Sequence, residues 1–361
     1  MAFSSVVLAP NAFKGTLSPL AAARAMAAGV ERACPGRPVL LRPLPDGGDG
    51  TLDVLLAALG GERASAEVDD ACGRRREVAF GLVDRRGGRT AIIESALVLS
   101  LAHGARCPFS ERRTDGLGQL IRCALDRGAR TIYVGLGGSA TCDAGLGLLS
   151  ALGLRFRGSR ADIRLGGAQT AGPEGLDPRL RQTRLVVLTD VLNILLGPKG
   201  ASLFAPQKGA DRAELEALEA TLTRLADLLE LRFGRRVREL PGSGAAGGLG
   251  FAFALLGARL VRGAPAIARL TGLYRAIAAS GLVITGEGAC DGQTAYGKGP
   301  QIVAAKARAL GKPVILICGR IEPSFTPLAP LFSRCAPLMP AASSALALSL
   351  TVADILAADG L

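Results

Sequence analysis

Glycine-rich segments carry most of the residues in this chain that could do chemistry. The first reads GLGGSATCDAG at residues 135–145 and follows an apolar run typical of a buried strand. Backbone N–H groups, two hydroxyls and the start of a following helix can together hold a phosphate or a carboxylate. A plain strand–turn–helix connection needs fewer glycines, so we interpret Gly137, Gly138, Ser139 and Thr141 as candidate phosphate-binding residues.

A second segment reads GSGAAGGLG at residues 242–250. Its spacing fits G-x-G-x-x-G, but no clear strand precedes it, and no acidic residue stands about 20 positions further on, where a nicotinamide ribose needs one. The pattern is therefore weak as a dinucleotide fingerprint. As an anion-binding loop that opens a helix it is credible, with Gly244, Gly247 and Gly248 as phosphate-binding candidates.

Carboxylates follow two further apolar runs. Asp190 and Asn193 come after the run at 184–189, and Asp46 follows the run at 39–42. A carboxylate at the end of a strand can accept a proton from a hydroxyl or hold Mg²⁺. We therefore consider Asp190 a candidate base and metal ligand, against the alternative of a helix-capping Asp, and Asn193 and Asp46 candidate binding residues.

The segment TGEGACDGQTAYGKG at residues 285–299 combines acids with a lysine. Residues 292–298 satisfy G-x-x-x-x-G-K, but Gly299 replaces the Ser or Thr that would ligate Mg²⁺, so an ordinary P-loop fails at its metal position. Glu287 and Asp291 are instead candidates for metal ligation or for hydrogen bonds to a substrate.

Lysine is rare in this Arg-biased chain, and its positions are informative. Four of the six lysines stand beside glycine: Lys14, Lys199, Lys208 and Lys298. A compact ammonium suits a tight phosphate site better than the guanidinium fork of Arg does. Lys14 also lies between a strand end and a helix start, a natural place for an anionic group, although an exposed loop lysine is the alternative.

Composition excludes other chemistries. The chain has one histidine, His103, so a two-His zinc site cannot form, and its eight cysteines include no C-x-x-C pair. Glycine-rich loops with Lys, Asp, Glu, Ser and Thr fit phosphoryl transfer, which needs held anions, a divalent cation and one carboxylate toward the attacking hydroxyl.

The elements that must position these loops alternate along the chain. Short apolar runs are separated by Ala/Leu-rich helical patterns, which indicates a parallel α/β architecture. Ser18-Pro19 predicts a helix start, and Asp211 with Glu214 predicts a capping box. The expected strands are 5–9, 39–42, 90–94, 131–136, 184–189, 282–285 and 314–318, and a strand, a turn and a final helix are expected between residues 335 and 353.

Charge and segment composition bear on partners and location. The formal net charge is +12, but the arginines are spread along the chain without interleaved aromatic residues, so we expect no nucleic-acid partner. We find no signal-peptide pattern and no apolar run near the roughly 20 residues of a membrane span. A cytoplasmic protein without a membrane partner is therefore expected, and its scattered cysteines are expected to be reduced thiols.

The loops, in this order, resemble the type 1 glycerate kinase family, bacterial enzymes that phosphorylate glycerate with ATP. The resemblance runs from residue 9 to about residue 300, and its six ordered motifs together make it specific. The matching stretches are APNAFKGTL at 9–17, DGGDGT at 46–51, GGSAT at 137–141, PQKGA at 206–210, the segment 242–250, and GEG at 286–288 with DGQT at 291–294.

The resemblance implies an α/β fold of two domains. One is expected to be a Rossmann-like or flavodoxin-like parallel-sheet domain built from residues 1–65 and 275–361, the other an α/β domain inserted at 66–274, with the active site in the cleft. The implied substrates are D-glycerate and ATP with Mg²⁺, and the implied product of the bacterial branch is 2-phosphoglycerate. The oligomeric state is left open, with a homodimer as one alternative.

Carried onto this sequence, the resemblance makes Asp190 the carboxylate that accepts the hydroxyl proton, with Lys14 as a second catalytic residue. Asp190 and Asp291 are the implied Mg²⁺ ligands. The substrate-binding candidates are Asp46, Asn193, Glu287, Asp291 and Gln293, and the phosphate-binding candidates are Gly137, Gly138, Ser139, Thr141, Gly244, Gly247, Gly248, Lys208 and Lys298.

The sequence departs from the family around this site. Leu192 and Ile194 stand where the family usually has Asp and Pro, and Asp115 stands where it typically has Tyr. Three alternatives therefore stay open: phosphorylation at C3 of glycerate, a kinase for a related hydroxy acid, or a glycerate or nucleotide sensor without turnover. A nicotinamide oxidoreductase is disfavoured by the missing ribose-binding acid.

Overall fold

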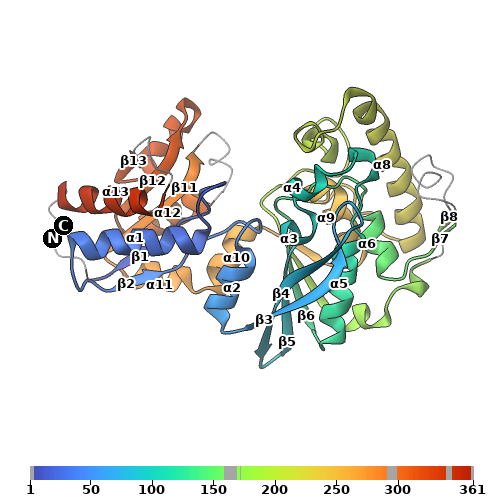
Figure 1. The fold of residues 1–361 in the computed structure, drawn as a ribbon, viewed down its shortest axis with the longest axis horizontal. Helices are drawn as coiled ribbons and strands as arrows, with labels where there is room; N and C mark the ends of the chain where they lie inside the picture. The colour runs from blue at the N-terminus through green and yellow to red at the C-terminus, as the bar shows by residue number, and fades with distance from the viewer. Residues whose placement is uncertain (1–3, 158–168, 171, 291–298, 339–343, 359–361) are drawn as a thin grey trace. The chain divides into compact units, whose positions relative to one another are not determined.

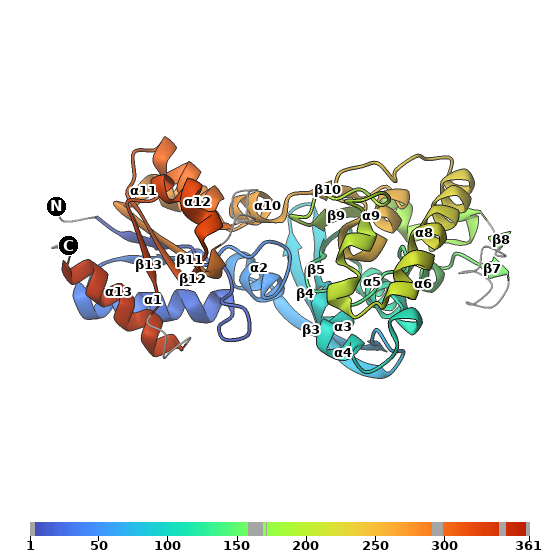
Figure 2. The same ribbon diagram turned by 90° about the horizontal axis from the view of Figure 1, so that it is seen from above.

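The computed structural model describes residues 4–157, 169–170, 172–290, 299–338 and 344–358. The chain divides into two compact units, one of Met1–Leu59 with Gly263–Leu361 and the other of Gly60–Arg262. Figure 1 and Figure 2 show that each combines a sheet with helices. The expected fold class is confirmed: two α/β units, of which one is a parallel sheet formed by both ends of the chain.

The first unit contains a five-stranded sheet in which all paired strands are parallel. Its elements are β1 (Val6–Leu8), α1 (Pro19–Ala33), β2 (Val39–Leu41), α2 (Thr51–Leu59), α10 (Gly263–Leu270), α11 (Leu273–Ala279), β11 (Leu282–Cys290), α12 (Gly299–Ala309), β12 (Val314–Ile321), β13 (Arg334–Pro337) and α13 (Ala345–Ala358). The strand order is β13-β12-β11-β1-β2. Helices α1 and α13 cover one face of this sheet and α11 and α12 the other (Figure 2).

Helix α1 begins where the sequence predicts. The Ser18 hydroxyl accepts a hydrogen bond from the Ala21 amide at 3.2 Å, and Pro19 occupies the first turn. Gly29 allows α1 to pack directly on α13, because a Cβ at this position would lie 2.4 Å from the carbonyl oxygen of Ser349.

The second unit contains a six-stranded mixed sheet. Its elements are β3 (Glu62–Asp69), β4 (Arg75–Arg85), β5 (Gly88–Glu94), α3 (Ser95–Leu99), α4 (Leu101–Gly104), α5 (Asp115–Asp126), β6 (Thr131–Gly135), α6 (Leu146–Ala151), β9 (Arg184–Leu188), α8 (Arg212–Phe233), α9 (Ala245–Leu255) and β10 (Arg259–Val261), with a separate small pair of β7 (Phe156–Arg157) and β8 (Gln169–Thr170). The order is β10-β9-β6-β5-β4-β3. The four strands from β10 to β5 are parallel, whereas β4 runs antiparallel to both β5 and β3.

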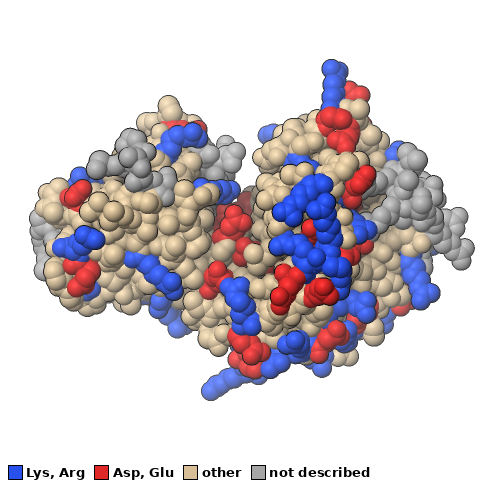
Figure 3. Space-filling view, viewed as in Figure 1, with Lys and Arg blue, Asp and Glu red and all other residues tan. Residues whose placement is uncertain are grey.

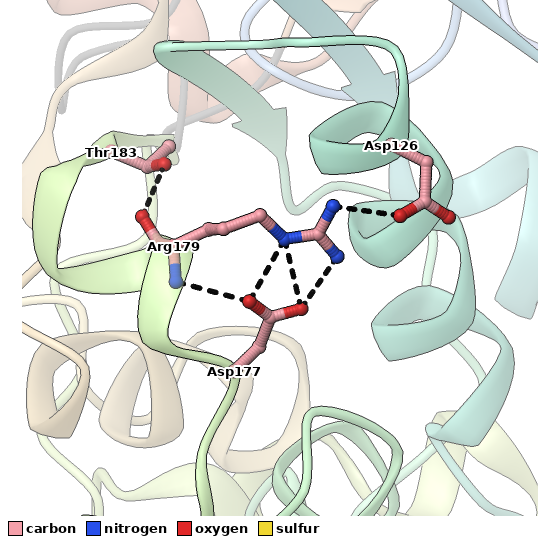
Figure 4. A network of polar contacts seen from close by, with 4 residues as sticks. All are labelled: Asp126, Asp177, Arg179 and Thr183. Carbon is pink, nitrogen blue, oxygen red and sulfur yellow. Dashed lines mark hydrogen bonds and ion pairs between the residues drawn. The ribbon is translucent and has the colours of Figure 1, made fainter.

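A network around Arg179 connects the segment before β9 to α5. The Arg179 guanidinium lies 2.7 Å from Asp126 of α5 and 2.7 Å from Asp177, as Figure 4 shows. The capping box predicted for the start of α8 is also confirmed, since the Asp211 carboxylate accepts from the Glu214 amide at 2.8 Å and Glu214 accepts from the Asp211 amide at 3.0 Å.

The predicted strands can be compared with those of the structure. All seven expected strands are present, and the expected strand and final helix near the C-terminus correspond to β13 and α13. Strands β3, β4, β7, β8 and β10 are not predicted from the sequence. Within the described residues, no helix has the length and apolar character needed to cross a membrane.

The expectation that all cysteines are reduced thiols is wrong for four of the eight. Cys72 forms a disulfide with Cys107, and Cys290 forms one with Cys318. The members of each pair are 35 and 28 residues apart in sequence, and only the folded chain brings their Cα atoms to 5.8 and 6.3 Å. The free cysteines are Cys34, Cys123, Cys142 and Cys335.

Candidate active site

Three loops of the second unit meet at the carboxyl ends of its parallel strands. Strands β6 and β9 are neighbours, with Gly135 opposite Leu188, so the loops that follow them leave the sheet side by side. The third loop, residues 242–248, overlaps the start of α9, where Ala246, Gly247 and Gly248 have positive φ and are not helical. In open α/β sheets this edge is where ligands bind.

The loop after β6 is in close contact with the loop before α9. The hydroxyls of Ser139 and Thr141 lie 3.2 Å apart, and that of Ser139 lies 3.5 Å from the carbonyl oxygen of Ala246. Gly247 approaches so closely that a Cβ there would lie 2.1 Å from the Thr141 carbonyl oxygen. The structure thus brings together two glycine-rich segments that are about 100 residues apart in the sequence.

The backbone is strained where these two loops meet. Ala144 has φ 51° and Ala246 has φ 54°, and they are the non-glycine residues with positive φ in the described part of the chain. The Ala144 amide donates to the carbonyl of Gly247 at 3.1 Å, so the two strained segments are hydrogen-bonded to each other. Strained backbone of this kind is retained mainly at functional sites.

Lys208 places a positive charge beside the glycine loop. The residue is 8% exposed, and its Nζ donates to the Thr141 carbonyl at 2.8 Å. Among the described residues it forms no ion pair with a carboxylate. Burial lowers the pKa of this ammonium, which is the expected effect of removing a cation from water. A buried cation that is held by a carbonyl is suited to receive an anion.

Arg112 is hydrogen-bonded to both the glycine loop and Lys208, and it is not among the candidates predicted from the sequence. Its guanidinium donates to the carbonyl of Ala140 at 3.3 Å, to that of Cys107 at 3.4 Å and to that of Lys208, and it lies over the Phe109 ring at 5.6 Å. The residue is 6% exposed. Arg112 is followed by Arg113 in the sequence, and nothing local distinguishes the pair from exposed arginines.

The loop after β9 carries Asp190 and Asn193. Asp190 is half-buried, two residues beyond the end of β9. The Asn193 side-chain amide donates to the Lys199 carbonyl at 2.5 Å, and its backbone carbonyl accepts from the Gly244 amide at 2.9 Å. The loop after β9 is therefore hydrogen-bonded to the loop before α9. The side chain of Lys199 is exposed.

The first unit holds Lys14 and Glu287 on adjacent segments. Lys14 is exposed in the loop after β1, and Glu287 is 6% exposed in β11. The Gly288 amide donates to the Ala12 carbonyl at 3.3 Å, and a Cβ on Gly288 would lie 3.0 Å from the Lys14 amide nitrogen. These candidates are thus brought together within their own unit.

Asp46 has a structural role in its loop. Its Oδ1 accepts from the Gly48 amide at 3.1 Å, the pattern of an Asx turn, which uses part of its hydrogen-bonding capacity. The remaining candidates Asp291, Gln293 and Lys298 lie outside the described residues.

The acidic side chains of the site determine how Mg²⁺ could be bound there. No group of three or more His, Cys, Asp or Glu side chains suited to a metal occurs among the residues that the structure describes. Mg²⁺ is usually held by one or two carboxylates together with phosphate oxygens and water rather than by an all-protein cage. A half-buried carboxylate such as Asp190 beside an anion loop fits this mode of binding.

Comparisons with known proteins agree on one family. The chain matches the model of the Glycerate kinase family over residues 6–355. It is 39% identical over 332 residues to a glycerate kinase of Halalkalibacterium halodurans, covering 88% of this chain and 86% of that protein. It is 37% identical over 330 residues to the glycerate 2-kinase of Escherichia coli, covering 88% and 85%. A crystal structure of a protein assigned as glycerate kinase 2 from Salmonella typhimurium superposes with a TM-score of 0.83 at 34% identity, covering 99% of this chain and 98% of that one.

Proposed function

Because the chain belongs to the glycerate kinase family, we propose that it transfers the γ-phosphoryl group of ATP to the C2 hydroxyl of D-glycerate, with 2-phosphoglycerate and ADP as products. Phosphorylation of glycerate is the activity of the family. The choice of C2 is supported by the name of the Escherichia coli relative, a glycerate 2-kinase. A cytoplasmic location is proposed with it, since ATP is available there.

The observation that carries the proposal is the buried Lys208 ammonium on the Thr141 carbonyl, within a set of glycine-rich loops at the carboxyl ends of β6 and β9. Phosphoryl transfer depends on held phosphates more than on covalent chemistry by the protein. Loop amides and a compact cation provide such a hold. The proposed phosphate-binding residues are Gly137, Gly138, Ser139, Thr141, Gly244, Gly247, Gly248 and Lys208, with Lys298 beyond the described part.

Asp190 is proposed to accept the proton of the attacking hydroxyl. It follows β9, next to the loop with Ser139 and Thr141, so a hydroxyl held there would face the phosphates. Asn193 is a proposed partner for the substrate, and Lys14, Asp46 and Glu287 are candidates for its carboxylate and hydroxyls. Asp190 would also hold Mg²⁺, with Asp291 as a second candidate ligand; the bound ion neutralises phosphate charge.

A single spectrum tests the proposal. The purified protein is incubated with D-glycerate and Mg²⁺-ATP, and the products are read by proton-coupled phosphorus NMR. A new phosphomonoester doublet is expected, because C2 carries one proton; a triplet would mean C3 phosphorylation and would overturn the position. If ATP remains intact, the substrate assignment fails, and the assay is repeated with other small hydroxy acids and with direct ligand-binding measurements to separate a related kinase from a sensor.

A further inference from the structure

The two disulfides of the chain differ in their access to solvent. Cys72 and Cys107 are both half-exposed, whereas Cys290 and Cys318 are each 0% exposed. Thiol–disulfide exchange requires that a thiolate reach a sulfur atom. The first disulfide is therefore the more accessible to exchange in the folded protein, and the second provides an internal control.

The Cys72–Cys107 disulfide connects the β3–β4 turn to the segment 100–107, which contains α4. This segment has little apolar packing of its own. Between residues 101 and 107 only Gly104 is buried, Leu101 is 44% exposed, and the backbone amides of 104–107 donate to carbonyls within the segment. His103 also contacts Arg76. Segments with few buried contacts open at low free energy, so the disulfide is a principal restraint on this one.

The same segment packs against the phosphate-binding candidates. Ser100 forms a β-bridge with Ser139, and a Cβ on Gly104 would lie 2.3 Å from that of Ala140. The Ala140 amide also donates at 2.7 Å to the carbonyl of Leu99, which directly precedes the segment. A displacement of 100–107 therefore alters the surroundings of Ser139 and Ala140.

A second path runs through Arg112. Its guanidinium donates to the carbonyl of Cys107, which is one end of the disulfide, and also to the carbonyls of Ala140 and Lys208. The disulfide is thus connected to both the glycine loop and the buried lysine.

The local charge favours exchange. Cys72 lies two residues before the run Arg74-Arg75-Arg76, and Arg106 directly precedes Cys107. Basic side chains gather on this face of the second unit, over α3 and α4 (Figure 3). Positive charge stabilises the thiolate that leaves when a disulfide is attacked. The free Cys142 does not compete, because burial raises the pKa of its thiol to about 11.

We propose that Cys72–Cys107 is a thiol–disulfide exchange site. Its reduction by a dithiol loosens the segment 100–107 and the Ser139–Thr141 loop. A thiolate of the dithiol attacks one sulfur, the S–S bond breaks, and the departing cysteine takes up a proton. The second thiol of the reagent then attacks the mixed disulfide and releases the other cysteine. Two electrons and two protons pass from the dithiol to the protein.

The chemical part of the test follows the sulfur atoms. Protein purified without reductant is treated with dithiothreitol under native conditions, alkylated, digested and analysed by mass spectrometry. Cys72 and Cys107 are expected to be labelled only after reductant, and Cys290 and Cys318 only after denaturation as well. Labelling of Cys72 and Cys107 before any reductant, or their resistance to it in the native protein, overturns the proposal.

The structural part compares hydrogen exchange in oxidised protein, reduced protein and the variant C72S/C107S. Amides of residues 99–107 and 139–141 are expected to exchange at least about fivefold faster in the reduced protein and in C72S/C107S than in the oxidised protein. The variant C34S/C123S, which removes two free thiols, is the matched control and should behave as the oxidised protein does. Equal exchange in all four samples overturns the proposal.

An effect on turnover rests on the proposed function. Reduction is expected to raise the KM for ATP about fivefold or more with a smaller change in kcat, since it disturbs a binding loop rather than Asp190. If exchange rises and the KM for ATP does not, the modification site is supported and the assignment of Ser139–Thr141 to ATP phosphates fails.

Discussion

The ammonium of Lys208 lies 2.8 Å from the carbonyl oxygen of Thr141, which stands 67 residues earlier in the chain. Only 8% of the Lys208 residue is exposed. A buried cation loses most of its hydration, and one carbonyl restores only part of that loss. An anion at the Ser139–Thr141 loop would complete the compensation. The segments GGSAT and PQKGA therefore form one binding feature in the folded protein.

Replacing Lys208 with Met removes the charge and keeps the apolar stem. We expect the KM for ATP to rise about 10- to 100-fold, because a hydrogen bond to a charged group contributes about 1.5–3 kcal/mol. Steady-state kinetics measures this, with the exposed Lys199→Met as the matched control.

Because burial lowers the pKa of Lys208, binding of ATP by the native protein should also weaken as the pH rises into the alkaline range. If the Lys208→Met enzyme kept the native KM for ATP and the same weakening of ATP binding at alkaline pH, Lys208 would not be a phosphate-binding residue.

Gly247 should tolerate no side chain. It has φ +70°, and a Cβ would lie 2.1 Å from the Thr141 carbonyl oxygen. Gly272 has φ +71° with nothing within 4 Å of its Cβ position, so Gly272→Ala carries the backbone strain alone. We expect Gly272→Ala to cost about 1–2 kcal/mol of unfolding free energy, and Gly247→Ala to cost more and to lower kcat/KM as well. Equal costs in denaturant titrations, with activity unchanged, would refute the close contact between the two loops.

The parallel strands could be predicted because strands buried on both faces are short apolar runs, such as Val6–Leu8 and Arg184–Leu188. Strand β3 could not, since its sequence ERASAEVD is polar and half-exposed and it forms through eight paired positions with β4. The glycine loops were predictable from composition, but their mutual contact was not.

The role of Arg112 shows the same limit at the site. Its partners Ala140 and Lys208 are 28 and 96 residues away in the sequence, so no local pattern reveals them. The disulfide of Cys72 and Cys107 is equally a product of the fold, because 35 residues separate the two cysteines. Local patterns predict which loops carry chemistry; only the fold shows what holds those loops together.

Arg179 should contribute modestly to stability, in a pH-dependent way. Its hydrogen bond and charge lower the pKa of Asp177, so the contribution is complete above the ordinary pKa of Asp and is lost as the pH falls through the lowered value. With 41% of the Arg179 side chain exposed, we expect Arg179→Ala to reduce the unfolding free energy by about 0.5–1 kcal/mol at pH 7, and by less in acid. Urea titrations at both pH values test this, with the exposed neighbour Arg181→Ala as the control. A difference that grows in acid would contradict the assigned sign.

Asp190→Asn tests the proposed base directly. The amide has nearly the same size but cannot take up the hydroxyl proton, so we expect kcat to fall about 10²- to 10⁴-fold while thermal unfolding stays close to that of the native protein. Asp84→Asn, which changes an exposed carboxylate of β4 that pairs with Arg89 at the start of β5, should leave kcat unchanged.

The two roles proposed for Asp190 predict different behaviour of the residual activity. If Asp190 acts mainly as the base, added Mg²⁺ leaves the low kcat of Asp190→Asn unchanged. If it acts mainly as a metal ligand, half-saturation shifts to higher Mg²⁺ and excess metal restores part of kcat, because an amide oxygen is a weaker ligand than a carboxylate. Full activity at ordinary Mg²⁺ would remove Asp190 from both roles and shift attention to the carboxylate of Glu287, which is 6% exposed in β11 of the first unit.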